Sequence, residues 1–405
     1  MIWCLLFSIT AWAKEPTLSE FLQIAWNSSA QPQFENARQD SAEQRISSAR
    51  GKYYPHVSLE ALDTDGFPAS NSGLHIGGIM GSPYRKGWAY GVAVEETVYD
   101  FGRIGAALAE AKAESTLEEA KLAADKMTFL TSVGGLYLSC ARAYSLERMN
   151  ERLMGWAKML MNETGKYAKT GQRSIVDRSL IQSEVMELEL QRAELNRTLE
   201  SLHQQMALYS SEVGCLPLSV TWTTEVPKEL RVPEPSGLLA RAHLEIARSG
   251  VDGAAAAQRP SIRVTGSAGD MQTARLVKEK DYAVGVGVVF PIWNGGEDYH
   301  REQAARSAAS AQTEALRLTE TEVKRHMLSL RTSYARNKES LTGLEKNLEQ
   351  IRETMKLASR RYQHLEGPLV DVRDSFRQLR AIEGKRIDVM SQLASTGLEL
   401  GLLRD

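Results

Sequence analysis

The stretch WAYGVAVEETVYDFGR at residues 88–103 decides the fold, because a related stretch, YAVGVGVVFPIWNGGE, follows at residues 282–297. Each residue of the first stretch lies 194 positions before its counterpart in the second. The same offset aligns Ser-Ile-Val-Asp at residues 174–177 with Pro-Leu-Val-Asp at residues 368–371. One offset, without insertion or deletion over about ninety residues, predicts two copies of one long module.

The composition describes a helix-rich chain with nearly balanced charge. The 405 residues include 49 Lys and Arg and 51 Asp and Glu. Because the charges nearly cancel, a nucleic-acid partner is not expected. Ala, Leu, Glu, Arg and Gln are abundant, as in long helices. The 7 histidines form no HExxH motif, and the glycines form neither a P-loop nor a dinucleotide fingerprint. We therefore expect no enzymatic activity, no metal site and no cofactor.

The first 13 residues predict a secretory signal peptide, since an apolar run ends in Ala-Trp-Ala before Lys14. Cys4 lies inside that run, which leaves Cys140 and Cys215. Two cysteines so far apart predict free thiols rather than a disulfide framework or a zinc site. After residue 13 there is no run of 18 apolar residues, so no transmembrane helix is predicted. A chain of this kind can still enter a membrane through strands.

Apolar periodicity and turn residues divide the remaining chain into two repeats and a connector. The first repeat, 14–211, is predicted to contain a short helix over 17–51, a β-hairpin over 57–99, a long helix over 103–169 and a return helix over 174–211. A proline-rich connector spans 212–236. The second repeat, 237–405, is predicted to contain a short helix, a β-hairpin over 261–292, a long helix over 297–366 and a return helix over 369–403.

The second strand of each hairpin alternates large apolar residues with small ones. Valines and aromatic residues share one face, and alanine and glycine share the other. A band of valines with aromatic residues at its ends is typical of a strand that faces lipid. We therefore predict a membrane girdle formed by Trp88, Tyr90, Tyr282 and Phe290. The alternative is a soluble β-sandwich, in which the same side chains fill a core.

The two long helices are expected to pack along their whole length. Residues 297–366 carry apolar residues at spacings of three and four over about seven heptads. Such a helix measures roughly 100 Å and cannot be buried within one small globule. Each long helix ends at a short break, residues 170–173 in the first repeat and residues 366–368 in the second. Ser174 is placed to cap the first return helix, and Pro368 suits the first turn of the other.

This order of elements resembles the TolC-like outer membrane efflux protein family. The motifs that carry the resemblance are Lys-Tyr-Tyr-Pro at 52–55, Val-Tyr-Asp-Phe-Gly-Arg at 98–103 and Pro-Ile-Trp-Asn-Gly-Gly at 291–296. The resemblance implies an α+β membrane protein that forms a homotrimer. Four strands from each of three chains would close a 12-stranded barrel in outer-membrane lipid, and the helices would continue it as a coiled-coil tube through the periplasm.

The family resemblance also implies a function. It predicts an outer-membrane exit duct, for type I protein secretion or small-molecule efflux, that is opened by a periplasmic adaptor and an inner-membrane ABC or RND transporter. The cargo stays open, although a chain without an acylated N-terminal cysteine leans towards protein secretion or a shared duct. The alternative is a periplasmic coiled-coil adaptor or scaffold.

The resemblance assigns a pore constriction to Asp371 and Asp374. These residues lie one turn apart on one helix face, just after the second break. In three copies the carboxylates would form an acidic ring that binds cations and filters permeants. The alternative is two solvated acids that are favoured by the helix dipole. Arg373 between them departs from a purely acidic ring.

The resemblance places an adaptor-contact tip at both breaks. In the first repeat Gly171, Ser174 and Asp177 fit the family motif, and in the second Tyr362 and Gly367 occupy the tip. The family often has an arginine near position 367 that helps to hold the tip shut. Since Gly367 has no side chain for this role, we expect Arg173 or Arg178 of the other hairpin to replace it.

Overall fold

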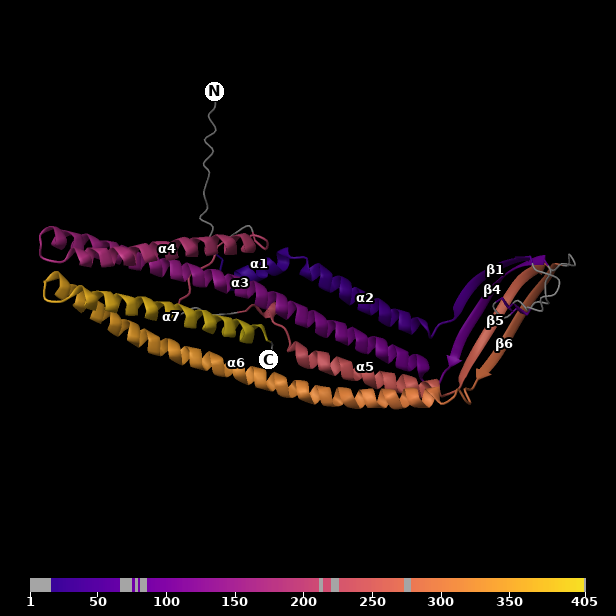
Figure 1. The fold of residues 1–405 in the computed structure, drawn as a ribbon. Coiled ribbons are helices and arrows are strands. Elements are labelled where there is room, and N and C mark those ends of the chain that lie inside the picture. Colours follow the sequence, from indigo (N-terminus) through magenta and orange to yellow (C-terminus); the bar gives the residue numbers. More distant parts are fainter. Residues whose placement is uncertain are drawn as a thin grey trace, which may run out of the picture. The chain divides into compact units, whose positions relative to one another are not determined.

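The computed structural model describes residues 16–65, 75–76, 79–80, 86–210, 214–219, 226–272 and 278–403. The first half contains α1 (Leu18–Ser28), α2 (Gln31–Gly51), β1 (His56–Asp65), β2 (His75–Ile76), β3 (Ile79–Met80), β4 (Lys86–Tyr99), α3 (Arg103–Lys169) and α4 (Ile175–Met206). The second half contains α5 (Pro235–Ala257), β5 (Ser261–Gln272), β6 (Lys278–Val289), α6 (Glu297–Gln363) and α7 (Leu369–Leu402), with a 3₁₀ turn at Lys228–Leu230 before α5. Figure 1 shows the elements in this order. The predicted class, a helix-rich chain with four long strands, is confirmed.

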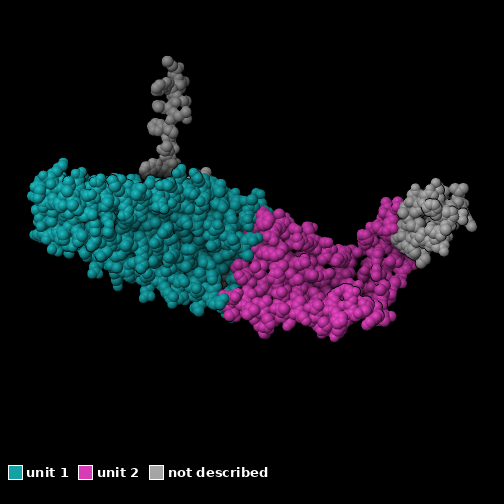
Figure 2. Space-filling view, in the orientation of Figure 1, with its two compact units in different colours: residues 1–33, 123–234, 323–405 teal, residues 34–122, 235–322 magenta. Residues whose placement is uncertain are grey.

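The chain forms two compact units, and each unit draws on both repeats (Figure 2). Unit 1 contains residues 1–33, 123–234 and 323–405, and unit 2 contains residues 34–122 and 235–322. Unit 1 therefore holds both helical hairpins with their turns. Unit 2 holds the four-stranded sheet and the helices next to it in the chain.

The repeat is visible in the backbone. Helices α3 and α6 each have 67 residues, and each follows two residues with left-handed backbone, Phe101 and Gly102 in one copy and the glycines at 295–296 in the other. The Asp100 side chain accepts hydrogen bonds from the backbone N–H groups of residues 102 and 104, and Asn294 accepts one at the matching site in α6. These caps satisfy the first N–H groups of each long helix.

The sheet in unit 2 is antiparallel, in the order β1-β4-β5-β6. Strand β4 of the first repeat pairs with β5 of the second, so the two hairpins form one sheet. Among the described strands, β1 and β6 each have one neighbour, which leaves two open edges. Open edges favour pairing with another chain. Between β1 and β4 the chain also forms the short pair β2–β3.

The two faces of this sheet differ in polarity. One face carries exposed large apolar side chains, which are Val57, Leu59, Tyr90, Val92, Val94, Tyr282, Val284, Val286 and Val288. The opposite face carries small and polar side chains, including Arg263 and Glu95, whose Nη1 and Oε1 atoms lie 3.1 Å apart. The pattern is the reverse of a soluble sheet, which buries its apolar face.

Unit 1 has a continuous apolar core between the hairpins. Helix α1 buries Leu18, Phe21, Leu22 and Ala25 and begins with a reciprocal capping box between Thr17 and Glu20. Near the end of α7, the Leu398 side chain packs directly on Gly134 of α3, where a Cβ atom would lie 2.3 Å from Leu398 Cδ2. The absence of a side chain at this glycine therefore lets α3 and α7 approach closely.

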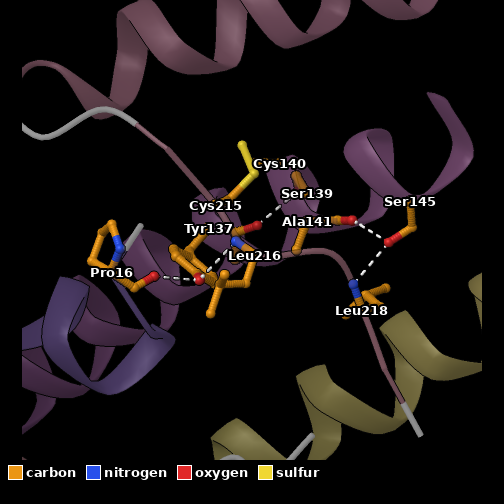
Figure 3. Close-up of a disulfide and its surroundings, with 10 residues drawn as sticks. Pro16, Tyr137, Ser139, Cys140, Ala141, Ser145, Cys215, Leu216 and Leu218 are labelled. Atoms are coloured by element: carbon orange, nitrogen blue, oxygen red, sulfur yellow. Dashed lines mark hydrogen bonds between the residues drawn. A yellow bond between two sulfur atoms is a disulfide. The ribbon is translucent and has the colours of Figure 1, made fainter. Parts of the chain in front are cut away.

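The prediction of two free thiols is wrong, because Cys140 and Cys215 form a disulfide (Figure 3). They are 75 residues apart in sequence. Residues 214–219 of the connector lie against α3, and this contact brings the two sulfurs together. Sequence spacing alone does not reveal this long-range contact.

Three predicted helix boundaries also need correction. The helix expected over 17–51 is divided, because Ser29 is extended and its hydroxyl accepts from the Gln31 N–H at the start of α2; Pro32 next to it also disfavours a continuous helix. Helix α4 ends at Met206 rather than residue 211, and the Tyr209 carbonyl accepts a hydrogen bond from the Ser28 hydroxyl instead. Helix α6 ends at Gln363 rather than residue 366, because Leu365 is left-handed.

In the part of the chain that the structure describes, no helix is both long enough and apolar enough to cross a membrane.

Candidate functional site

The candidate site is the pair of tips at which the helical hairpins of unit 1 turn. At the first tip, Gly171 has a φ of 73°. The N–H groups of Gln172 and Arg173 both donate to the carbonyl of Tyr167, at 3.0 and 3.3 Å. This arrangement satisfies a carbonyl that the end of α3 would otherwise leave without a partner.

The second tip has the same backbone geometry with different residues. Leu365 has a φ of 62°, and the N–H groups of Glu366 and Gly367 donate to the Arg361 carbonyl at 2.8 and 3.1 Å. A left-handed leucine costs about 1–2 kcal/mol relative to glycine. At Gly367, a Cβ atom would lie 3.2 Å from Arg361 Cβ, so this position favours glycine because of space rather than backbone angle.

The return helices begin in different ways. The Ser174 hydroxyl accepts from the Val176 N–H at 3.1 Å and thereby caps α4. Pro368 precedes α7 without a side-chain cap, and as a proline it has no N–H group of its own that needs a partner. The predicted tip residues Gly171, Ser174 and Gly367 therefore all lie in the two turns.

Tyr362 lies at the centre of the paired tips. Its ring is fully buried against an apolar cluster, which consists of Leu160, Ile181, Leu369 and Val372. Its hydroxyl donates to Asp177 Oδ2 at 3.3 Å. Burial raises the pKa of the Tyr362 phenol above its usual value, and the nearby Asp177 carboxylate raises it further. The phenol therefore stays neutral and remains a hydrogen-bond donor at physiological pH.

Arg173 links the first tip to the second. Its Nη2 atom donates to the Gly367 carbonyl at 2.7 Å and to the Tyr362 carbonyl at 3.4 Å. Its guanidinium carbon lies 4.8 Å from the centre of the Tyr362 ring, within the range of a cation–π contact. Arg178, the other residue considered for this role, packs instead against Gly165 in its own hairpin.

A second set of contacts joins the hairpins near the tips. The Tyr167 hydroxyl donates to the Gln363 carbonyl at 3.2 Å, and the Gln363 amide donates to both carboxylate oxygens of Glu163 at 3.1 Å. These contacts connect α3 with α6. Both long helices are therefore held together at their ends by polar groups as well as by the apolar cluster.

Asp371 and Asp374 lie on the exposed face of α7, away from the buried side chains of Val372 and Phe376. Within the described residues, neither carboxylate has a hydrogen bond or an ion pair. The same face continues with Gln378, Ala381, Lys385 and Gln392, which are all exposed. This face of α7 is thus a polar stripe whose tip end is acidic.

Charged pairs lie farther along the helices of both hairpins, at residues that the sequence pattern alone did not single out. The buried Glu184 of α4 accepts from Arg377 of α7, with Nε and Oε1 2.8 Å apart. Glu383 of α7, also buried, pairs with Arg152 and Arg352. A signal was present, because both glutamates occupy core positions of the helical pattern. Removing one partner of such a pair leaves a buried charge without compensation.

The predicted girdle residues lie in unit 2. Tyr90, Tyr282 and Phe290 are exposed, and the Tyr90 hydroxyl donates to Asp270 Oδ2 at 3.0 Å on the neighbouring strand. Trp88 belongs to β4, but its side chain lies outside the described residues. From Tyr282 to Phe290, just after β6, the extended chain spans about 26 Å. At the strand tilt of a membrane barrel, about 40°, this length gives a height of about 20 Å, close to that of the apolar band on such a strand.

Part of the chain resembles a known protein family. Residues 226–401 match the model of the outer membrane efflux protein family. No curated protein sequence matches the chain.

Several solved outer-membrane proteins share the whole fold. The outer membrane protein VceC of Vibrio cholerae is 16% identical, with 95% of this chain and 94% of that chain covered at a TM-score of 0.80. The Campylobacter jejuni CmeC outer membrane channel is 14% identical, with 96% and 86% covered at a TM-score of 0.76. The Neisseria gonorrhoeae MtrE outer membrane channel in its open state is 18% identical, with 96% and 90% covered at a TM-score of 0.72. Residues 226–401 therefore resemble the outer membrane efflux protein family, and over 95–96% of its length the chain has the fold of these solved outer-membrane proteins.

Proposed function

We propose that three copies of this chain form a passive exit duct in the outer membrane that continues into the periplasm. The observation that carries the proposal is the four-stranded sheet with an exposed apolar face and two open edges. In lipid every backbone N–H and C=O group needs a partner within the protein, so an open sheet must close. Pairing of β6 in one copy with β1 in the next would close three sheets into one barrel of 12 strands.

An uncovered stripe on α4 supports a multi-chain helical tube. Opposite its buried face, α4 carries Val176, Ser179, Ser183, Met186, Leu190 and Ala193 at alternating spacings of three and four. All six residues are exposed in the single chain. Spacing of this kind forms a coiled-coil seam, and we assign it to a helix of the neighbouring copy.

The polar stripe on α7 would line the duct. Its acidic end, formed by Asp371 and Asp374, lies next to the tip contacts made by Arg173 and Tyr362. Two unpaired carboxylates from each of three copies would concentrate negative charge in a narrow throat. Such a throat attracts cations and slows anions.

The tips themselves would meet a periplasmic adaptor, which in turn would join the duct to an inner-membrane transporter. Ile175 is exposed at the first tip, and Leu365 and Val370 are exposed at the second. Exposed apolar side chains at both turns offer a contact surface for the ends of adaptor helices. The free duct would stay closed through the Arg173 and Tyr362 contacts, and the adaptor would release them.

A matched pair of substitutions tests the barrel. Val264 and Thr265 are neighbours in β5 with side chains on opposite faces of the sheet. Val264→Arg places a charge on the apolar face, which costs about 2–4 kcal/mol of stability near a bilayer midplane. Thr265→Arg places the same charge on the polar face. We expect the first variant to lose detergent-extracted trimer, measured by light scattering, and the second to retain it. A monomer that osmotic shock releases without detergent would instead indicate a periplasmic scaffold.

A conductance measurement tests the throat. In planar bilayers, replacement of both acids by Asp371→Asn and Asp374→Asn should abolish block by divalent cations and leave the trimer intact. Persistent block would show that these carboxylates do not line the throat. The cargo can be identified separately, by comparing secreted proteins and drug sensitivity in cells with and without the chain.

A further inference from the structure

The connector between the repeats is fastened to α3 in unit 1 at successive turns of the helix (Figure 3). The Tyr137 hydroxyl accepts from the Leu216 N–H at 3.2 Å and donates to the Pro16 carbonyl at 2.6 Å. One turn farther along, Cys140 is bonded to Cys215. One phenol and one covalent bond thus hold both the start of the described chain and the connector on α3.

A third attachment follows on the same helix. The Ser145 hydroxyl donates to the Ala141 carbonyl at 2.6 Å and accepts from the Leu218 N–H at 2.8 Å. At its other end the connector is joined to α7, where the Val232 N–H donates to the Leu402 carbonyl at 2.7 Å. The connector therefore ties α3 of the first repeat to the end of α7 in the second.

The disulfide is inaccessible once the connector has docked. Cys140 is 0% exposed and Cys215 is 3% exposed. Thiol–disulfide exchange requires an attacking thiolate to reach a sulfur atom. The bond must therefore form before residues 214–219 settle on α3, while both cysteines are still open to an oxidant.

A histidine lies beside the two sulfurs. A ring nitrogen of His203, in the last turn of α4, lies within 4.8 Å of both. An imidazolium next to a thiol stabilises the thiolate and speeds exchange. Before the connector docks, His203 of α4 is thus placed to activate the thiol of Cys140, which lies on α3 in the same hairpin.

We propose that Cys140 and Cys215 are a thiol-oxidation site, at which a disulfide-donating oxidoreductase of the cell envelope fastens the connector before the chains assemble. One cysteine thiolate attacks the disulfide of the oxidant and forms a mixed disulfide, with release of one oxidant thiolate. The second cysteine thiolate then attacks the first cysteine's sulfur, the Cys140–Cys215 bond forms, and the oxidant leaves as a dithiol. Two electrons pass to the oxidant, and the two protons from the cysteines end on its thiols. This proposal rests on the periplasmic location in the proposed function.

The thiol state of wild-type protein is the first test. Protein extracted from membranes is unfolded and treated with a polyethylene-glycol maleimide, with and without prior reduction. We expect two additional adducts after reduction in the wild type, and none in the double variant Cys140→Ala with Cys215→Ala. Two free thiols in unreduced protein, or a zinc ion bound by the cysteines and His203, would overturn the proposal. Neither result depends on conduction or on the trimer, so failure of the proposed function would be recognised separately.

The second test measures how strongly the disulfide holds the connector on α3. A disulfide that closes a loop of this length disfavours the unfolded state, and it lowers the unfolding equilibrium constant by up to about a thousandfold. We therefore expect at least tenfold faster amide exchange at Leu216 and Leu218 in the double variant, with Ser139→Ala as a control on the same helix that leaves the connector contacts intact. Unchanged exchange would overturn the proposal. In cells that lack the oxidant, a small-molecule disulfide in the medium should restore the yield of the wild-type protein. The yield of the double variant should not respond.

Discussion

The two helical tips have the same backbone and different side chains, and the difference shows how a repeat acquires a function. Both turns place a left-handed residue before two N–H groups that share one carbonyl. The first tip contributes a cation and an acid, Arg173 and Asp177, whereas the second contributes the Tyr362 phenol and the backbone carbonyl groups of residues 362 and 367. Arg173 of the first hairpin donates to carbonyl groups of the second, and Tyr362 of the second donates to Asp177 of the first. Each hairpin therefore supplies both a donor and an acceptor, and the pair can close on itself. Two identical tips would not offer these complementary groups.

The largest effect is expected where the first tip reaches the second. Arg173→Ala removes two charge-assisted hydrogen bonds and a cation–π contact, at about 2–3 kcal/mol for the tip closure. The open fraction in planar bilayers should rise at least tenfold. Arg178→Ala is the matched control, since this side chain packs within its own hairpin. If both variants conduct alike, Arg173 does not hold the tips together.

The difference between the two tips can be tested next by exchanging their left-handed residues, Gly171 and Leu365. Gly171→Leu copies the second tip into the first and should destabilise it by about 1–2 kcal/mol, whereas Leu365→Gly should stabilise the second tip by a similar or smaller amount. Amide exchange at Gln172 and Glu366, which follow the substituted residues, reports each turn separately. We expect shifts of opposite sign. Shifts of the same sign would mean that side-chain contacts, rather than backbone strain, decide these turns.

A smaller effect is expected at the shared hydrogen bond. Tyr362→Phe keeps the buried ring but loses the hydroxyl that donates to Asp177. The closed tip should lose about 1 kcal/mol of stability. Tyr167→Phe is the control, because its hydroxyl donates to a backbone carbonyl in a more exposed place.

The same tyrosine gives a pH test with a definite sign. The pKa of Tyr362 is raised in the folded tip, so the neutral phenol stabilises closure fully below the unfolded value of about 10, and this stabilisation is lost as the pH rises above it. Closure measured by amide exchange should therefore be constant up to about pH 10 and weaken above. The Phe variant should show no such loss at this position, and an equal loss in both proteins would assign the titration to another group.

The fold class could be predicted because it depends on local patterns that recur. The alternation in residues 88–99 and the turns with Gly171 and Gly367 are recognised within short windows, and the same patterns recur at the offset between the repeats. The partners of Arg173 and the pair formed by Cys140 and Cys215 could not be derived in this way. They depend on which helices lie side by side, and charge and sulfur carry no periodicity that reveals a distant partner. The break at Ser29 was missed because its side-chain hydrogen bond competes locally with the helix.

The smallest effect is expected at the N-caps of the two return helices. Substitutions there test whether the stability of both helices depends equally on the capping residue. Ser174→Ala removes the hydrogen bond to the Val176 N–H, at about 0.5–1 kcal/mol. Pro368→Ser should give α7 a similar cap and gain only a few tenths of a kcal/mol, because the loss of the proline's rigidity offsets the new bond. Amide exchange in the first turns of α4 and α7 measures both. Since the buried Leu369, Val372 and Phe376 already hold α7 in place, a large gain from Pro368→Ser would mean that packing fixes this tip less firmly than its burial indicates.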